Sequence, residues 1–572
     1  MVTGPRRVTL VTDELLGYTR TGGIGTATSF LALALGRMGH RVDVLYTADT
    51  PTAAMSAEWA HAYEDARVAI RLLPRSDGAV EPPYFARMLD VERALAADRP
   101  EVVVVHDLAA PAYTAVRMRQ LGLGFAQTLF VAYCHGTRRW ITDMARKVRV
   151  LPGAHAITIL EQASIELADV VVSPSRYLID WMRQERWRLP SRSLVIPYLT
   201  HAVATGKESP PRAAAATNGV ERIAFFGRLE ERKGLRAFAA GLNRLEPELL
   251  RGRELQFVGA PTPAWPPRRV ESLLSADVRG ALREISFATD LDQPEALERL
   301  SRPGTLAVMP SFGETFSNTV YECLERGIPF IASDAGAPRE LVAEDDRPRV
   351  LFEPTAEGVA AALGRALRDS DALRPARPAL DAHAAYEAWA DVMRMTPQRD
   401  VPPERAQGAD WALLLDERDE PDPRLEEMLR RAQAASGADV VTCGVRLGAT
   451  ERLFLGDPGG LGLVENHYGA AALVRRSLLP DTREPLWPLL ARLVTSGAQI
   501  VSIPRALVER GDPEVADGPA EALAVVQRFE ERLPPALRSL ARLTAGLAAA
   551  NAAAGPPRRS RPQRLIDRIV RR

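Results

Sequence analysis

The sequence of 572 residues is poor in cysteine and in long apolar runs. Cys134, Cys323 and Cys443 are far apart and odd in number, so they predict neither a disulfide framework nor a zinc site. No apolar run reaches the roughly 18 residues of a membrane-spanning helix, and the first residues lack the apolar segment of a signal peptide. We therefore expect a cytoplasmic protein.

The chain also lacks net charge and has little lysine. Its 73 basic residues balance its 73 acidic residues, which gives no support for nucleic-acid binding. With 46% hydrophobic and 26% charged residues the composition is that of a soluble globular protein, and the length predicts about three or four domains. Only Lys147, Lys207 and Lys233 are lysine, so a compact ammonium group is expected to matter where one is kept.

The most informative stretch runs from Val308 to Val342. An apolar strand at Gly304–Met309 leads into a polar loop, and an amphipathic helix follows from about Phe316 to Arg326. Glu314 lies in the loop and Glu322 in the helix. Because open parallel sheets bind ligands at the carboxyl ends of their strands, both carboxylates are expected beside a ligand.

The position of Glu322, about one and a half turns into the helix, suits a carboxylate that accepts two hydrogen bonds from a ribose diol. The backbone N–H groups of Phe316, Ser317 and Asn318 open the same helix and suit a phosphate. A buried helix with two incidental surface glutamates would show the same spacing.

The first predicted domain, residues 1–197, alternates strands and helices as a doubly wound sheet does. After a strand at Val8–Val11 come Gly22-Gly23-Ile24-Gly25 and a helix that reaches about Met38. Adjacent glycines let the backbone approach a phosphate closely. The spacing differs from G-x-G-x-x-G, and no acidic residue ends the next strand, which disfavours a nicotinamide site.

Two histidine-containing segments, His106-Asp107 and His135-Gly136-Thr137, fall just past the ends of predicted strands. His135 is equally compatible with a contact to a transferring sugar and with a loop histidine bonded to backbone, whereas His106 suits the second role. The further strands of this domain are expected at Val42–Tyr46, Val68–Leu72, Val102–Val105, Leu129–Cys134, Val170–Ser173 and Leu194–Ile196.

Residues 198–220 are predicted as a linker, because small residues and a Pro-Pro pair mark a boundary. The second domain, residues 221–397, restarts the strand–turn–helix pattern. Its first turn carries Arg228 and Lys233 at the carboxyl end of a strand. Two cations there can neutralise a departing diphosphate, although a solvated basic turn would contain the same residues.

Taken together, these motifs resemble the retaining GT-B glycosyltransferases of family 4 over about residues 5–395. The resemblance is carried by the Gly-Gly-Ile-Gly loop, by Ala168–Ser175, by Gly227-Arg228-Leu229 with Lys233-Gly234, and by Glu314 with Glu322 ahead of Gly327-Ile328-Pro329. It implies an α/β GT-B fold, with two Rossmann-like lobes and a nucleotide sugar in the cleft between them.

The resemblance also implies roles. Arg228 and Lys233 would hold the diphosphate, Glu322 the ribose and Glu314 the donor sugar, with Gly23 near the phosphates and His135 near the sugar. Glu314, His135, Arg228 and Lys233 are the catalytic candidates. The substrate-binding candidates are Gly23, Arg228, Lys233, Glu314, Thr315, Phe316, Ser317 and Glu322.

The implied activity is a hexosyltransferase reaction from a nucleotide sugar to a hydroxyl of a glycan, a lipid-linked acceptor or a small molecule. Configuration would be retained, and neither a metal nor another cofactor is implied, because the basic pair takes the metal's place. A role in cell-surface polysaccharide synthesis is expected. Two alternatives stay open: a nucleotide-sugar epimerase or hydrolase, and a catalytically silent scaffold. At Ile196–Leu199 the sequence departs from the family, which puts the contacts between lobes in question.

Residues 404–512 resemble part of a GT-A domain of glycosyltransferase family 2. Asp416 and Asp419 follow a strand at Trp411–Leu415, as metal-binding acids do in that family, but the chain has no room for the nucleotide-binding half of such a domain. We expect a non-catalytic module that is inert, binds acceptor or forms a homo-oligomer.

The tail, residues 513–572, is predicted to be helical and basic. Its end, Arg561–Arg572, has the composition to touch the cytoplasmic face of the inner membrane, where a lipid-linked acceptor would lie. A disordered solubilising tail is the favoured reading.

Overall fold

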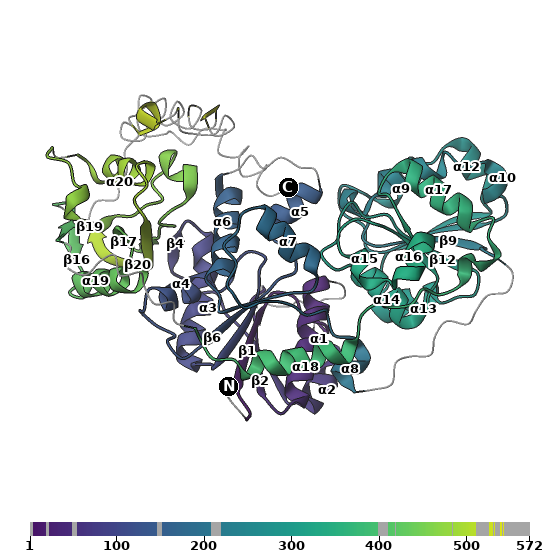
Figure 1. Ribbon diagram of the computed structural model, residues 1–572, viewed down its shortest axis with the longest axis horizontal. Helices are drawn as coiled ribbons and strands as arrows, with labels where there is room; N and C mark the ends of the chain where they lie inside the picture. The colour runs from purple at the N-terminus through teal and green to yellow at the C-terminus, as the bar shows by residue number, and fades with distance from the viewer. Residues whose placement is uncertain are drawn as a thin grey trace.

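The computed structural model describes residues 4–18, 22–48, 54–145, 152–206, 219–398, 410–417, 419–482 and 484–510, with short pieces between 525 and 542. They form a first lobe (residues 4–206), a second lobe (219–381) and a third module (410–510). In Figure 1 the first lobe lies between the other two units.

The first lobe contains a sheet of seven parallel strands in the order β3-β2-β1-β5-β6-β7-β8. The valines of β5 are buried on both faces, as is typical of a parallel strand covered by helices on either side. The strands are β1 (Arg7–Thr12), β2 (Arg41–Tyr46), β3 (Val68–Leu72), β5 (Val102–His106), β6 (Leu129–Tyr133), β7 (Val170–Ser173) and β8 (Ser193–Val195). The helices are α1 (Gly23–Arg37), α2 (Ala57–Asp65), α3 (Tyr84–Asp98), α4 (Tyr113–Gln120), α5 (Arg138–Met144), α6 (Pro152–Glu166), α7 (Arg176–Gln184) and α8 (His201–Thr205).

The second lobe contains six parallel strands in the order β11-β10-β9-β12-β13-β14. The strands are β9 (Arg222–Phe226), β10 (Glu254–Val258), β11 (Glu284–Ala288), β12 (Thr305–Met309), β13 (Phe330–Ser333) and β14 (Leu351–Phe352). The helices are α9 (Leu235–Leu242), α10 (Pro247–Leu250), α11 (Pro267–Glu271), α12 (Ala276–Ala281), α13 (Gln293–Leu300), α14 (Asn318–Arg326), α15 (Pro338–Leu341), α16 (Arg347–Val350) and α17 (Ala356–Ala366). The predicted pair of Rossmann-like lobes is confirmed.

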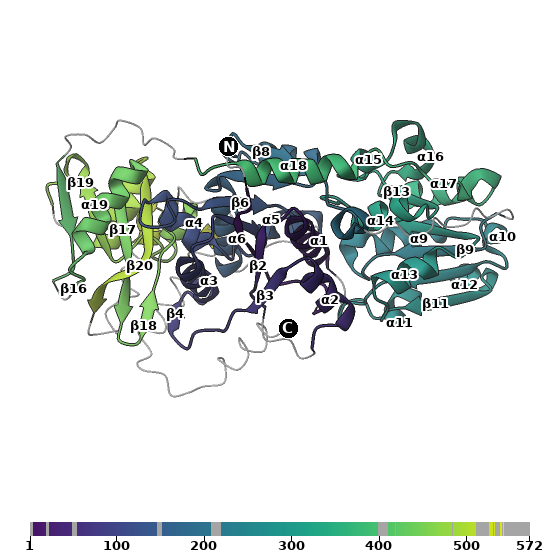
Figure 2. The same cartoon turned by 90° about the horizontal axis from the view of Figure 1, so that it is seen from below.

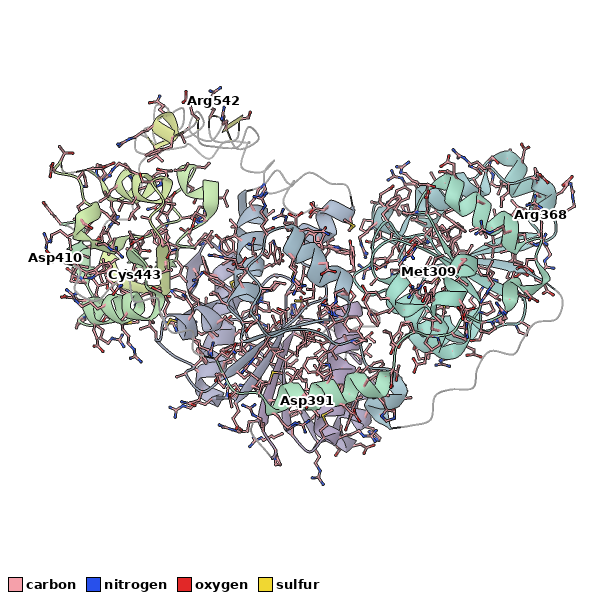
Figure 3. The ribbon with its side chains drawn as sticks, in the orientation of Figure 1. Met309, Arg368, Asp391, Asp410, Cys443 and Arg542 are labelled. Atoms are coloured by element: carbon pink, nitrogen blue, oxygen red, sulfur yellow. The ribbon has the colours of Figure 1, made fainter. Side chains whose placement is uncertain are left out.

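Helix α18 (Ala382–Arg394) leaves the second lobe and packs on the first (Figure 2). Trp389 on this helix is fully buried, with its ring 5.2 Å from that of Tyr133 at the end of β6. The buried guanidinium of Arg6 donates to the carbonyls of Met393 and Met395, at 2.9 and 2.7 Å. Figure 3 labels Asp391 on this helix, in front of the first-lobe sheet.

Part of the predicted linker is folded. Tyr198 and Leu199 are buried, and Thr200 caps helix α8 by accepting a hydrogen bond from the N–H of Val203. Residues 207–218 lie outside the described residues. The first nine residues of the predicted linker are therefore part of the first lobe's packing.

The third module has a mixed sheet that continues into the first lobe. Strand β4 (Ala79–Glu81) comes from the first lobe and pairs in parallel with β18 of the module; nothing in the sequence pattern indicates this pairing. The module's own strands are β15 (Trp411–Leu414), β16 (Asp419–Pro421), β17 (Val440–Leu447), β18 (Thr450–Arg452), β19 (Ala471–Arg475) and β20 (Ile500–Arg510), and its helices are α19 (Leu425–Ser436) and α20 (Leu486–Thr495).

Side chains reinforce this junction. Met118 and Leu121 at the end of α4 belong to one apolar cluster with Leu425 and Leu429 of α19. Arg505 of β20 donates to both carboxylate oxygens of Glu92, which is 2% exposed. The first lobe and the third module therefore form one packed body.

Asp419, one of the two acids that lie where the GT-A family has metal-binding acids, has another partner. Both carboxylate oxygens of Asp419 accept hydrogen bonds from Arg510, at 2.6 and 3.0 Å. In the part of the chain that the structure describes, no three His, Cys, Asp or Glu side chains gather as a metal site would require. Within the same residues, no helix has the length and apolarity to cross a membrane. The resemblance of the module to a GT-A domain stays a prediction. Most of the tail, residues 513–572, lies outside the described residues, so the predictions for it also stay predictions.

Candidate functional site

A cavity of about 360 Å³ lies between the two lobes, at the carboxyl ends of both parallel sheets. Its walls come from the loops after β1, β5 and β6 of the first lobe and from the loops after β9, β10, β11 and β12 of the second. All nine predicted site residues line it, namely Gly23, His135, Arg228, Lys233, Glu314, Thr315, Phe316, Ser317 and Glu322.

The turn after β9 places the cations. A short 3-10 helix at Glu231–Lys233 ends at Gly234, whose φ is +76°. A Cβ atom at Gly234 would lie 1.9 Å from the carbonyl oxygen of Pro310. Glycine at this position therefore lets the basic turn pack directly against the end of β12, next to Glu314.

Lys233 and Glu314 form the shortest ion pair among the described residues of the cavity. The Nζ atom of Lys233 lies 2.5 Å from Oε1 of Glu314, and a guanidinium nitrogen of Arg232 lies 3.4 Å from Oε2. Burial raises the pKa of Glu314, but the charges of Lys233 and Arg232 outweigh it and bring that pKa to about 2. Burial lowers the pKa of Lys233, and Glu314 acts in the opposite direction. Glu314 is thus an anion at any physiological pH.

Arg232 is a cavity-lining residue that the sequence reasoning missed. Besides its contact with Glu314 it donates to the backbone carbonyl of Gly313, and its guanidinium lies 5.8 Å from the ring of Trp140 in the first lobe. The only sequence signal for Arg232 was its position next to Lys233. Arg228, by contrast, is exposed at the cavity, and we find no hydrogen bond or ion pair of its side chain within the described residues; its charge acts on Glu14 across the cleft.

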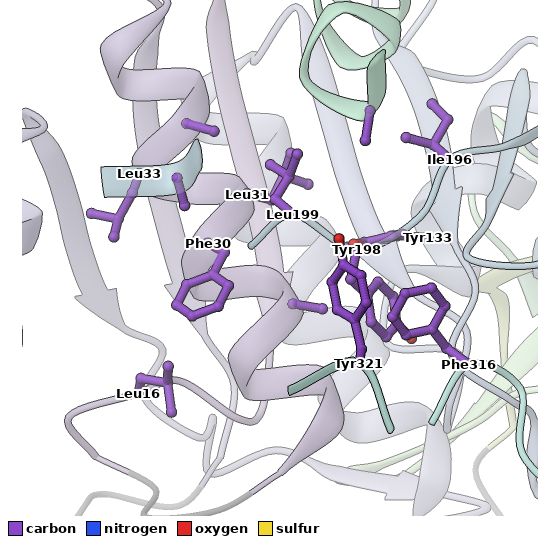
Figure 4. Packing of buried hydrophobic residues seen from close by; sticks show 14 of the residues in the cluster. Leu16, Phe30, Leu31, Leu33, Tyr133, Ile196, Tyr198, Leu199, Phe316 and Tyr321 are labelled. Carbon is purple, nitrogen blue, oxygen red and sulfur yellow. The ribbon is translucent and has the colours of Figure 1, made fainter. Parts of the chain in front are cut away.

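Helix α14 carries Glu322 at its fifth position and begins at Asn318, two residues later than predicted. The reason is Phe316, whose buried ring packs 4.5 Å from Tyr198 and 5.0 Å from Tyr321 (Figure 4), so that the chain turns at Ser317 with a φ of 70°. The side-chain amide of Gln293 donates to Oε1 of Glu322. Burial raises the pKa of Glu322 to about 7.

The first lobe contributes the start of α1. Gly23 faces the second lobe, since a Cβ atom there would lie 3.3 Å from the side-chain amide of Asn318. Glu14, which sequence reasoning did not single out, accepts a hydrogen bond from the N–H of Gly25 at 3.2 Å and packs against Gly22. Burial raises the pKa of this carboxyl group.

His135 is held from both sides. The buried carboxylate of Asp107 accepts hydrogen bonds from the N–H groups of His135 and Gly136, at 2.9 and 3.0 Å. The Nδ1 atom of His135 lies 2.6 Å from the hydroxyl oxygen of Tyr198, and its Nε2 atom is buried and without a hydrogen-bond partner among the described residues. Burial, with the nearby His106, keeps the pKa of His135 well below its usual value, so the ring is neutral.

Tyr198 belongs to Ile196–Leu199, the segment in which the sequence departs from the family pattern. It contacts His135 of the first lobe and Phe316 of the second. Two hydrogen bonds of Thr315 also join the lobes. The Thr315 hydroxyl donates to the carbonyl of His135 at 2.7 Å, and the Ser175 hydroxyl donates to the carbonyl of Thr315 at 2.5 Å.

Solved structures with a similar outline have low sequence identity to this chain. Sucrose-phosphate synthase from Thermosynechococcus elongatus is 18% identical, with a TM-score of 0.48, over 68% of this chain and 96% of that one. HepE from Anabaena, in complex with UDP-glucose, is 14% identical, with a TM-score of 0.45, over 68% and 99% of the two chains.

A curated relative, the D-inositol 3-phosphate glycosyltransferase of Nocardia farcinica, is 30% identical over 173 residues. That match takes in 29% of this chain and spans 37% of the relative's length. The family described as "Family 4 Glycosyltransferase in conflict systems" matches residues 10–396, which include both lobes and every residue of the cavity. Because this match covers more than half of the sequence, the chain belongs to that family of glycosyltransferases.

Proposed function

We propose that the chain moves a hexose from a nucleoside diphosphate sugar to a hydroxyl acceptor with retention of configuration. The supporting observation is one interlobe cavity that is lined by Arg228, by Lys233 in contact with the buried anionic Glu314, and by Glu322. In this arrangement the cations suit the diphosphate, Glu314 suits the donor sugar and Glu322 suits the ribose.

In this proposal the donor is bound mainly by the second lobe. The ribose diol donates to Glu322 and takes the place of the Gln293 amide. The diphosphate lies against Arg228 and Lys233, and the N–H groups at the start of α14 face it. From the first lobe, the backbone around Gly23 approaches the phosphates.

The chemistry follows from the charges. As the bond between the anomeric carbon and the phosphate oxygen breaks, negative charge grows on the phosphate, where Arg228 and Lys233 stabilise it. Positive charge grows on the sugar, beside the anionic Glu314. The neutral His135 offers its unpaired Nε2 atom to the sugar as a hydrogen-bonding group. The departing phosphate oxygen takes the proton of the acceptor hydroxyl on the same face, so the configuration is retained without a covalent enzyme intermediate.

We propose that three cations, Arg228, Arg232 and Lys233, supply the charge for which other transferases use a divalent metal. Turnover should therefore persist in EDTA and stay the same when Mg²⁺ or Mn²⁺ is added back. Loss of turnover in EDTA and its recovery with Mn²⁺ would contradict this part of the proposal.

The acceptor is proposed by class: a hydroxyl of a glycan, a lipid-linked sugar or a small molecule, entering from the first lobe. The curated relative acts, by its name, on a phosphorylated inositol. Incubation of the donor without an acceptor distinguishes these reactions. A transferase should leave the donor unchanged, whereas a hydrolase would release free sugar and an epimerase would form the epimer.

The decisive experiment is a thermal-shift panel of UDP, ADP and GDP sugars. A ligand at 100 times its dissociation constant stabilises a protein by about 2.7 kcal/mol, which is a readily measured shift. We expect one nucleotide class to stabilise the wild type and to lose most of this effect in Glu322→Ala. Equal nucleotide affinity in the variant would show that Glu322 does not bind the ribose, and no shift with any donor would contradict the proposed function.

A further inference from the structure

The two lobes also meet outside the cavity, at the amino end of α7. Both carboxylate oxygens of Glu340, on α15 of the second lobe, accept hydrogen bonds from the backbone of the first lobe. The N–H of Arg176 lies 2.7 Å from Oε2 and the N–H of Tyr177 lies 2.7 Å from Oε1. A carboxylate at this end of a helix meets unpaired N–H groups and the positive end of the helix dipole.

Glu340 is also connected to the cavity through its own lobe. Residues 335–337, immediately before α15, run beside Glu314: the N–H of Glu314 donates to the carbonyl of Ala335 at 3.1 Å, and the N–H of Ala337 donates to the carbonyl of Glu314 at 2.9 Å. A Cβ atom at Gly336 would lie 2.2 Å from the Glu314 carbonyl oxygen, so the two segments are in direct contact.

On the other side, the amino end of α7 is connected to the same loop. Ser175 caps α7 and donates its hydroxyl proton to the carbonyl of Thr315, the residue after Glu314. Thr315 in turn donates to the carbonyl of His135. One set of contacts therefore joins α7, the Glu314 loop and the His135 loop.

We propose that Glu340 is a positioning residue, which closes the cleft by binding the amino end of α7 and thereby sets Glu314 opposite His135. The inference rests on the proposed function for the role of Glu314 in catalysis. The contact itself is a separate, testable property of the two lobes. When Glu340 releases α7, the lobes separate and the Glu314 loop loses its support from the first lobe.

The test uses the full chain and removes the contact from each side. Glu340→Gln removes the carboxylate charge. Arg176→Pro removes one donor N–H without touching Glu340, and proline is accepted at the first position of a helix, here after Ser175 with extended φ and ψ of −145° and 156°. Arg176→Ala is the matched control, because it removes the same side chain and keeps the N–H. Glu357→Gln, on the exposed surface of α17, controls for the loss of one negative charge.

Lobe closure is measured by energy transfer between dyes on Arg41→Cys and Glu248→Cys, which are exposed in the first and second lobes. The three native cysteines are buried and therefore poorly reactive. We expect Glu340→Gln and Arg176→Pro to lower the transfer efficiency, with Arg176→Ala and Glu357→Gln equal to the parent. Unchanged efficiency in both test variants would overturn the proposal.

Backbone amide exchange separates positioning from general loosening. In the two test variants we expect peptides spanning 311–318 and 134–138 to exchange about tenfold faster, with β5 and β9 unchanged. Equal acceleration across both sheets would overturn the proposal in favour of a merely structural role. Neither measurement uses a nucleotide. The nucleotide panel can therefore fail while this inference stands, and this inference can fail while the panel succeeds.

Discussion

At the scale of single residues, Lys233 forms the shortest ion pair described in the cleft. It is the only lysine among the described residues of an arginine-rich chain, and it lies between the anionic Glu314 and the space proposed for the diphosphate. A compact ammonium can contact a carboxylate and a phosphate oxygen together, whereas a planar guanidinium favours one bidentate partner.

Replacing Lys233 tests this role. We expect Lys233→Met to lower kcat/KM by about 10²–10³, the usual cost of removing one preorganised charge contact to a transition state, because phosphate charge would then develop against Arg228 and Arg232 without the ammonium group. Steady-state kinetics measure the effect. Arg236→Met, one turn further along and paired with Glu231 at the surface, is the control and should change little. Comparable rates in the two variants would contradict the assignment.

We expect Glu322 to make the affinity for the nucleotide depend on pH. Its carboxylate must be ionised to accept the ribose hydroxyls, and burial raises its pKa to about 7. Protonation on going from pH 8 to pH 6 should therefore weaken binding of the nucleoside diphosphate by about tenfold. Calorimetric titration at both pH values measures this change. With Glu322→Gln the phosphate groups of the ligand still titrate, but the protein has no carboxyl group at this position. The tenfold change in affinity should therefore be absent in that variant, and its persistence would assign the effect to another group.

At the scale of elements, the cavity is built by turns that only glycine permits. Gly234 ends the basic 3-10 turn with a positive φ and touches the Pro310 carbonyl, while Gly336 touches the Glu314 carbonyl. Both close approaches bring a loop of one strand onto the loop of its neighbour, which is how residues far apart in the sequence reach one site.

The paired substitutions Gly234→Ala and Gly252→Ala separate strain from steric clash. Their φ values are similar, 76° and 72°, but a Cβ atom at Gly252 has nothing within 4 Å. We expect Gly252→Ala to cost about 1 kcal/mol of unfolding free energy, from the left-handed backbone alone. Gly234→Ala should cost clearly more and displace Lys233 from Glu314. Denaturant unfolding of both variants measures the difference, and equal losses would show that the turn relaxes around the added methyl group.

At the scale of the whole molecule, the third module is fastened to the first lobe. A first-lobe strand extends its sheet, and apolar side chains of α4 enter its core. The buried carboxylate of Glu92 depends on Arg505 of the module for its charge partner. The junction therefore supports the catalytic half whether or not the module binds a ligand.

Two changes test this dependence. Arg505→Ala should lower the unfolding free energy by about 2 kcal/mol, because it leaves Glu92 buried without its partner; the partial exposure of Arg505 keeps the loss below that of a fully buried pair. Truncation after residue 397 should yield aggregated protein, since Met118 and Leu121 become exposed. A soluble truncated chain with wild-type thermal stability would contradict both expectations.

The sequence by itself was sufficient for the two parallel sheets and for the nine residues that line the cavity. The physical reason is that apolar runs, glycine turns and helix starts are local signals, and parallel sheets gather the residues that follow their strands at one edge. Gly23 opens a helix and His135 follows a strand, whereas Lys233, Glu314 and Glu322 lie in the turn or helix after a strand, where the family resemblance also placed them.

Only the tertiary structure decided which partners these residues meet. Arg232 joins Glu314, Tyr198 joins His135, Glu340 reaches α7, and β4 completes a sheet whose other strands lie more than 300 residues further along the chain. Such contacts depend on how lobes close and how surfaces pack. No periodicity along the chain encodes them, because each partner is selected by distance in space rather than by spacing in sequence.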